Sequence, residues 1–80
     1  MTKRSDVQGP EVLAAVEAST APGSLQDITR ACGLPTSGTR YANDNECHVH
    51  GILTDLVGVG VVLRDVGYAD KWFYRNGKGY

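Results

Sequence analysis

One strongly amphipathic segment near the middle of the chain limits how the chain can fold. After Asn43 and Asn45, either of which can cap a helix, apolar residues recur at the spacing i, i+3, i+4, i+7 and i+8 until Gly58 ends the pattern. This spacing predicts a helix with one apolar face that other elements must cover. The apolar residues are Val49, Ile52, Leu53, Leu56 and Val57, of which we expect the first four to be buried.

The pattern changes from helical to strand-like after Gly60. Residues 61–66 and 71–75 are rich in β-branched and aromatic residues, and residues 67–70 have the composition of a turn. This order predicts a β-hairpin, followed by a frayed tail over residues 77–80. A hairpin is not stable alone in water, so it too must pack against other elements.

Two shorter helices are predicted before the amphipathic one. Pro10 and Glu11 suit the first turn of a helix over residues 10–19, and Ser24 followed by Asp27 suits the start of a second over residues 25–32. Residues 1–9 are polar, and we expect a loose N-terminal arm there. Residues 35–45 are not periodic and consist mostly of turn formers, so we expect a loop, which is long for so small a domain.

Length and composition restrict the class of protein. With 80 residues the chain is expected to be one domain over residues 1–80, of the α+β class, with three helices and a C-terminal β-hairpin around one core. No apolar run is long enough for a membrane span, and two cysteines cannot form the disulfide network of a small secreted domain. We therefore expect a cytoplasmic protein that does not enter a membrane.

Charge is unevenly distributed along the chain. Residues 40–59 have a formal net charge of −2 and residues 60–80 one of +2. No Lys or Arg lies between Arg40 and Arg64, and acidic side chains on the middle helix would repel phosphate groups. The positions expected to face outward on that helix are Glu46, His48, His50, Gly51, Thr54 and Asp55.

The cysteines and histidines do not form a recognisable metal or catalytic motif. Histidines at positions 48 and 50 would project about 200° apart on one helix, so they would not join one metal site. Cys47 and His50 are close enough on a helix to meet, but no third group is evident to orient the imidazole. We expect no metal, no cofactor and no catalytic residues, and Cys32 is expected to pack in the core.

Three consecutive aromatic residues lie in the second predicted strand. Since side chains alternate across a strand, Trp72, Phe73 and Tyr74 place aromatic groups on both faces. One face should belong to the core. The other is either exposed beside Lys71 and Arg75, where it suits a nucleic acid or a protein partner, or packed against the rest of the domain.

Several segments together resemble the winged helix-turn-helix family. Ser24–Pro35 looks like the second helix and glycine turn of that family, and Cys47–Leu56 looks like its recognition helix. Val57–Arg64 looks like the exit from that helix into the wing, and Trp72–Tyr74 looks like the returning strand of the wing. The similarity is closest to small bacterial and phage transcription regulators. The family's turn before the recognition helix is usually a few residues long, whereas here residues 35–45 intervene.

The resemblance implies a small regulator that binds double-stranded DNA, alone or as a homodimer, and that is not an enzyme. An alternative that fits the small size and the acidic middle is a protein-interaction module with the same fold. A phage-encoded inhibitor of a host nucleic-acid-binding complex, such as an anti-CRISPR protein, would be of this kind. For either function the candidate binding residues are Arg40, Tyr41, His48, His50, Thr54, Arg64, Lys71, Phe73 and Arg75.

Overall fold

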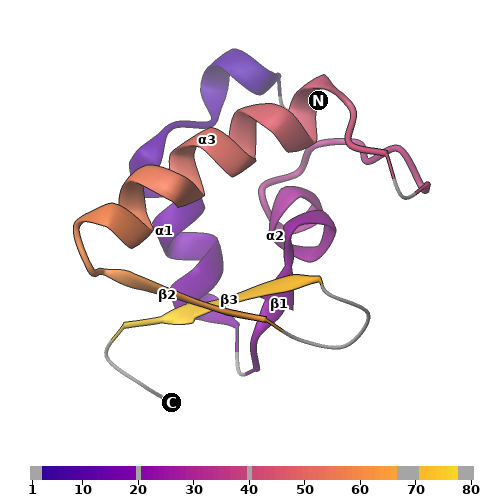
Figure 1. Cartoon of the computed structure of the whole chain (residues 1–80). Helices are drawn as coiled ribbons and strands as arrows, with labels where there is room; N and C mark the ends of the chain where they lie inside the picture. The colour runs from indigo at the N-terminus through magenta and orange to yellow at the C-terminus, as the bar shows by residue number, and fades with distance from the viewer. Residues whose placement is uncertain (1–2, 20, 40, 67–70, 78–80) are drawn as a thin grey trace.

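The computed structural model describes residues 3–19, 21–39, 41–66 and 71–77. Within these residues three α-helices pack on one side of a small antiparallel sheet of three strands (Figure 1). None of the described helices is long and apolar enough to cross a membrane. The elements in chain order are the 3-10 helix η1 (Arg4–Asp6), α1 (Gly9–Ala18), β1 (Gly23–Ser24), α2 (Leu25–Ala31), α3 (Asp44–Gly58), β2 (Val62–Val66) and β3 (Trp72–Asn76).

The starts of α2 and α3 are fixed by reciprocal side-chain caps. The Ser24 hydroxyl accepts a hydrogen bond from the Asp27 amide at 3.3 Å, and the Asp27 carboxylate accepts one from the Ser24 amide at 3.1 Å. Asn43 and Glu46 exchange the equivalent pair at 2.9 and 3.2 Å. These are capping boxes, and they confirm the two helix starts predicted from the sequence, with Asn43 rather than Asn45 as the cap.

The sheet is larger than the hairpin predicted from the sequence. Strands β2 and β3 form that hairpin, with Arg64 opposite Tyr74 and Asp65 opposite Phe73. Strand β1, between α1 and α2, adds to the other edge of β3, so the strand order is β1-β3-β2. The expected C-terminal hairpin is therefore part of a sheet that includes residues from the first third of the chain. Residues 67–70 and 78–80, where we expected a turn and most of a frayed tail, lie outside the described residues.

The core lies between the three helices and one face of the sheet. Of the four residues expected to be buried on α3, Val49 and Leu53 have no exposed surface. Ile52 and Leu56 are only half-buried and pack against the rim of the core, as does Cys32. The buried apolar residues are Val7, Val12, Val16, Ile28, Leu34, Val49, Leu53, Val62 and Tyr74.

The described part of the N-terminal segment differs from the loose arm that we expected over residues 1–9. Residues 4–6 form η1, and the Val7 side chain is buried in the core. His48 Nε2 lies 2.7 Å from the Val7 carbonyl oxygen, which joins the segment to α3. A carbonyl oxygen only accepts, so this nitrogen of His48 carries the hydrogen. A single apolar residue in a polar stretch has no periodicity, which is why the sequence analysis missed this contact.

Candidate functional site

The first turn of α3 buries a carboxylate that we expected to face solvent. Only 1% of Glu46 is exposed. Its Oε1 accepts a hydrogen bond from the Ser37 amide at 2.9 Å, and its Oε2 accepts one from the Asn43 amide at 3.2 Å. The expectation was wrong because a capping box turns the third helical side chain back towards the cap, and here the preceding loop covers it.

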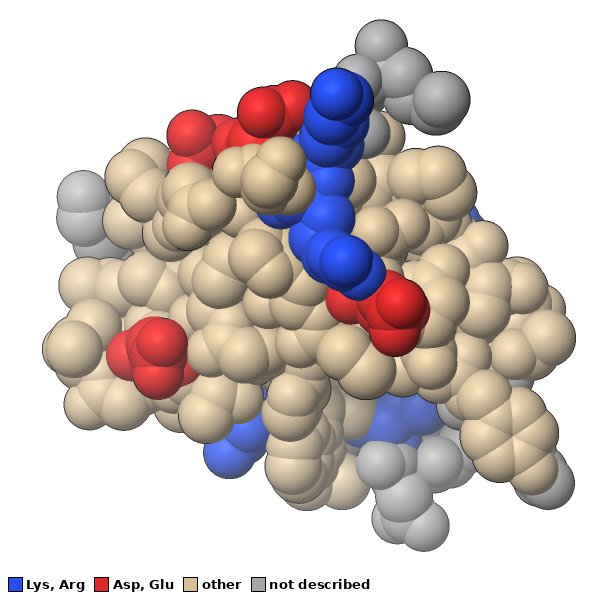
Figure 2. All heavy atoms as spheres, turned by 90° about the horizontal axis from the view of Figure 1, so that it is seen from above, with Lys and Arg blue, Asp and Glu red and all other residues tan. Residues whose placement is uncertain are grey.

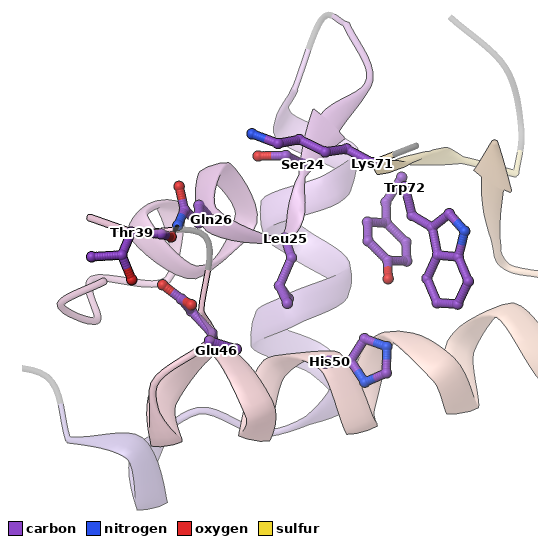
Figure 3. Close-up of a pocket in the computed structure, with 10 residues that line it drawn as sticks. Ser24, Leu25, Gln26, Thr39, Glu46, His50, Lys71 and Trp72 are labelled. Atoms are coloured by element: carbon purple, nitrogen blue, oxygen red, sulfur yellow. Dashed lines mark hydrogen bonds between the residues drawn. The ribbon is translucent and has the colours of Figure 1, made fainter. Parts of the chain in front are cut away.

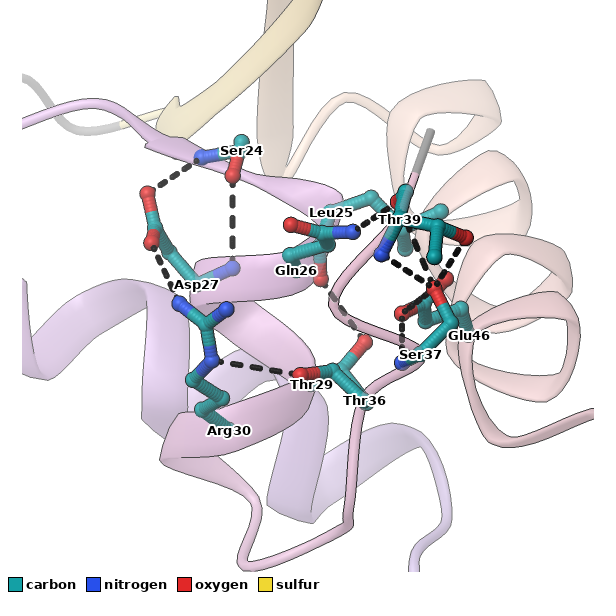
Figure 4. Close-up of polar contacts among 10 residues, drawn as sticks. All are labelled: Ser24, Leu25, Gln26, Asp27, Thr29, Arg30, Thr36, Ser37, Thr39 and Glu46. Atoms are coloured by element: carbon teal, nitrogen blue, oxygen red, sulfur yellow. Dashed lines mark hydrogen bonds and ion pairs between the residues drawn. The ribbon is translucent and has the colours of Figure 1, made fainter. Parts of the chain in front are cut away.

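The loop before α3 is irregular, as predicted, but it is attached to both neighbouring helices (Figure 4). The Gln26 side-chain amide donates to the Thr39 carbonyl oxygen at 2.7 Å, and Arg30 Nε donates to the Thr36 hydroxyl at 3.2 Å. Together with the bond from Ser37 to Glu46, these contacts hold residues 36–39 against α2 and α3. Residues 36–39 of the loop are therefore fixed in place and cover part of α2 and α3.

The two histidines of α3 project to different sides, as their spacing predicts, but neither is a free outward position. His48 is half-buried by its contact with the N-terminal segment. The His50 ring lies nearly parallel to the indole of Trp72, with ring centroids 6.1 Å apart and an angle of 13° between the planes. Thr54, one turn further along, is exposed, and its hydroxyl donates to the His50 carbonyl oxygen at 2.9 Å.

The Trp72 side chain connects α3 with the hairpin. The guanidinium carbon of Arg64 lies 4.0 Å from the indole centroid, which is a close cation–π contact. Arg64 also forms a hydrogen bond with the hydroxyl of Tyr74. Burial raises the pKa of Tyr74, and the hydrogen bond and charge of Arg64 oppose this shift. Arg64, Trp72 and His50 thus form one cluster drawn from β2, β3 and α3.

A cleft of about 310 Å³ opens beside this cluster (Figure 3). It lies between the start of α2, the loop before α3, α3 itself and the start of β3. Figure 3 shows His50 and Trp72 at one end and Glu46 with Thr39 at the other. Lys71 and Ser24 line the side formed by the sheet. The cleft combines aromatic surface, a buried carboxylate and a cation.

The structure brings only some of the predicted binding residues together. His50, Arg64 and Lys71 lie in or beside the cleft. Phe73 points to the opposite face of the sheet from Trp72, as strand alternation requires. Arg75 forms an ion pair with Asp65 at 2.8 Å.

The remaining candidates from the sequence analysis lie elsewhere. Tyr41 is 69% exposed, but it does not line the cleft. His48 contacts the N-terminal segment, and Thr54 lies on the exposed side of α3. Arg40 lies outside the described residues. In the described part of the chain no group of three or more His, Cys, Asp or Glu residues is placed to hold a metal ion.

Several residues of the cleft were not singled out from the sequence as part of a site. The capping box of Asn43 and Glu46 was recognised, but its consequence for the direction of the carboxylate was not drawn. Gln26 and Thr39 carried no signal, because their contact joins two segments with no common periodicity. Comparison with protein-family models, with curated proteins and with solved structures finds no match to this chain.

Proposed function

We propose that the chain is a winged-helix domain that binds double-stranded DNA, as a small regulator of the bacterial or phage type. The order of elements supports this fold: a helix, a short strand, two helices and a hairpin, with the strands in the order β1-β3-β2. In this proposal α3 is the recognition helix and the β2–β3 hairpin is the wing. The long loop before α3 is an addition to the usual helix-turn-helix connection.

The observation that carries the proposal is the surface shared by the hairpin and α3. Lys71 is exposed and forms no ion pair with the described residues, whereas Arg4, Arg30 and Arg75 each pair with an aspartate. Next to Lys71, Trp72 is 43% exposed and lies against His50 of α3. Because neutralisation of phosphate groups by Lys and Arg dominates DNA affinity, a lysine that has no ion pair in the described part of the chain and lies beside the proposed recognition helix is suitably placed for a backbone contact.

The test is duplex binding by a Lys71→Ala variant at several salt concentrations. If Lys71 contacts a phosphate, binding of random duplex DNA should weaken, and the slope of log K against log salt should fall by about one unit. Lys3→Ala is the matched control, because it removes an equal charge from the N-terminal segment, on the other side of α3 from the sheet (Figure 1). A parent protein that binds no duplex even at low salt would refute the proposed function.

A second candidate function, a protein-interaction module, is favoured by the charge of α3. The helix contains no Lys or Arg, and its exposed residues include Asp44 and Asp55. On the face shown in Figure 2, one narrow basic strip lies between acidic groups on a largely uncharged surface. Such a face suits a basic protein partner better than a phosphate backbone.

Neutralising both exposed aspartates of α3 distinguishes the two functions. If α3 faces DNA, the Asp44→Asn, Asp55→Asn variant should bind duplex DNA more tightly than the parent, because two repulsive charges are removed. Glu46 is left unchanged because it is buried. A double variant whose DNA affinity equals that of the parent would place α3 away from the DNA and favour the interaction module.

A further inference from the structure

We infer that the cleft between α2, α3 and the hairpin binds one nucleotide unit. In this arrangement the base stacks on the aromatic pair of His50 and Trp72, and the phosphate lies at Lys71. The inference adds a specific ligand to the proposed function, but it depends on the cleft alone. It can therefore hold whether or not duplex DNA binds.

The aromatic end of the cleft can receive a planar ring. His50 and Trp72 are nearly parallel, with 13° between their planes and 6.1 Å between their ring centroids, and Figure 3 shows both rings at the same end of the cleft. Two adjacent rings in nearly the same orientation make a platform wider than either ring. The guanidinium of Arg64 lies over the indole and does not line the cleft, so it supports the indole without filling the cleft. Bases of every kind stack on such aromatic surfaces.

The side formed by the sheet can receive an anion. Figure 3 shows the side chains of Ser24 and Lys71 next to each other, where the start of β3 lies beside β1. Both line the cleft. An ammonium group and a hydroxyl on one side provide the charge and the hydrogen-bond donors that a phosphate requires.

The carboxylate at the other end does not prevent the binding of an anion. Glu46 already accepts hydrogen bonds from the amides of Ser37 and Asn43 and from the Ser37 hydroxyl. It also lies on α3, across the cleft from Lys71 in Figure 3. The size of the cleft agrees with a small ligand, since about 310 Å³ is at the lower end of the range for ligand pockets.

The fluorescence of the protein reports on this cleft directly, because Trp72 is the only tryptophan of the chain. Deoxycytidine monophosphate should change the Trp72 emission saturably, deoxycytidine should bind more weakly, and inorganic phosphate alone should have little effect. Removing the stacking ring with His50→Ala should weaken nucleotide binding roughly tenfold. Cys47→Ala, an exposed substitution on the same helix, should leave it unchanged.

The phosphate contact is tested by Lys71→Ala with Lys3→Ala as its control. Lys71→Ala should weaken binding of the nucleotide roughly fivefold at low salt, while binding of the nucleoside stays the same. Far-UV circular dichroism of each variant establishes that it is folded. If the nucleotide does not change the Trp72 emission, or if both lysine variants weaken its binding equally, the inference is wrong.

A single-stranded oligonucleotide and duplex DNA are the two further ligands to test. The first shows whether the nucleotide unit is free or part of a strand, and the second distinguishes this inference from the proposed function. A single-stranded oligodeoxycytidine that binds more tightly than the mononucleotide indicates that a strand presents the base. Equal affinity indicates a free nucleotide as the ligand. Binding of the mononucleotide without any binding of duplex DNA would refute the proposed function but support this inference. Binding of duplex DNA with no response to the nucleotide would do the reverse.

Discussion

At the scale of single residues, Glu46 is the charged group of the cleft that holds both the start of α3 and the loop before it. A buried carboxylate is costly unless donors surround it, and this one accepts hydrogen bonds from the amides of Ser37 and Asn43. The contact with Asn43 fixes the start of α3, and the contact with Ser37 holds the loop. One side chain thus stabilises both a helix end and a wall of the cleft.

Replacing Glu46 tests this role. Glu46→Gln substitutes an amide nitrogen for one of two oxygens that both face donors, so it should lower the free energy of unfolding by about 1–3 kcal/mol. Asp44→Asn is the control on the same turn, because the Asp44 side chain is 92% exposed and its ion pair with Arg4 is therefore weak. Urea denaturation measures the free energy of unfolding of both variants. If the two variants were equally stable, the carboxylate of Glu46 would be hydrated rather than buried.

At the scale of elements, α3 is the helix on which the rest of the domain is assembled. It packs against α1, α2 and β2, and its buried apolar side chains, Val49 and Leu53, come from the periodic positions seen in the sequence. His50 projects from α3 towards the hairpin, and His48 projects from another side of the helix towards the N-terminal segment. Displacement of α3 would therefore disturb the core and the cleft together.

Truncation of the Leu53 side chain should show most clearly that the core depends on α3. Its side chain has no exposed surface, so Leu53→Ala should create a cavity and reduce the free energy of unfolding by roughly 2–5 kcal/mol. For a small domain this is a large share of a total stability of about 5–15 kcal/mol. Val59→Ala, a 74% exposed position at the end of α3, is the control. A thermal melt of Leu53→Ala that coincides with that of the control would show that the buried face of α3 is assigned wrongly.

At the scale of the whole molecule, two partly or fully buried groups link stability to alkaline pH. Burial, with the charge of Glu11 as a smaller cause, raises the pKa of Cys32 above its ordinary value of 9.0. Burial likewise raises the pKa of Tyr74 above 10.0, opposed by Arg64. Both groups stay protonated in the folded protein at pH values where the unfolded chain has begun to lose these protons.

The sign of the pH dependence follows from these shifts. Well below pH 9 both groups are protonated in both states and contribute no slope, but at higher pH the unfolded state binds fewer protons, so stability falls as pH rises. Urea denaturation between neutral pH and pH 11 should therefore show a decline beginning near pH 9. In Cys32→Ala the decline should begin later, near the ordinary pKa of tyrosine. An unchanged onset in that variant would contradict the assignment to Cys32.

The helices and the hairpin could be predicted from the sequence, because their signals are local. Capping boxes at Ser24 and Asn43, the apolar period of α3 and the change of pattern after Gly60 each involve residues within one or two turns of one another. Such signals do not depend on contacts between distant segments, so they can be recognised in the sequence alone. The helix bounds and the two strands of the hairpin agree with these predictions for that reason.

The directions of the polar and aromatic side chains of the cleft could not be predicted in this way, because they depend on the packing of distant segments. Strand β1 has two residues and no pattern of its own, and it exists because β3 offers a free edge. The burial of Val7 and Glu46, and the contact between His50 and Trp72, each depend on segments that are distant along the chain. Local periodicity says that a side chain leaves one face of a helix, but only packing determines whether another segment covers it.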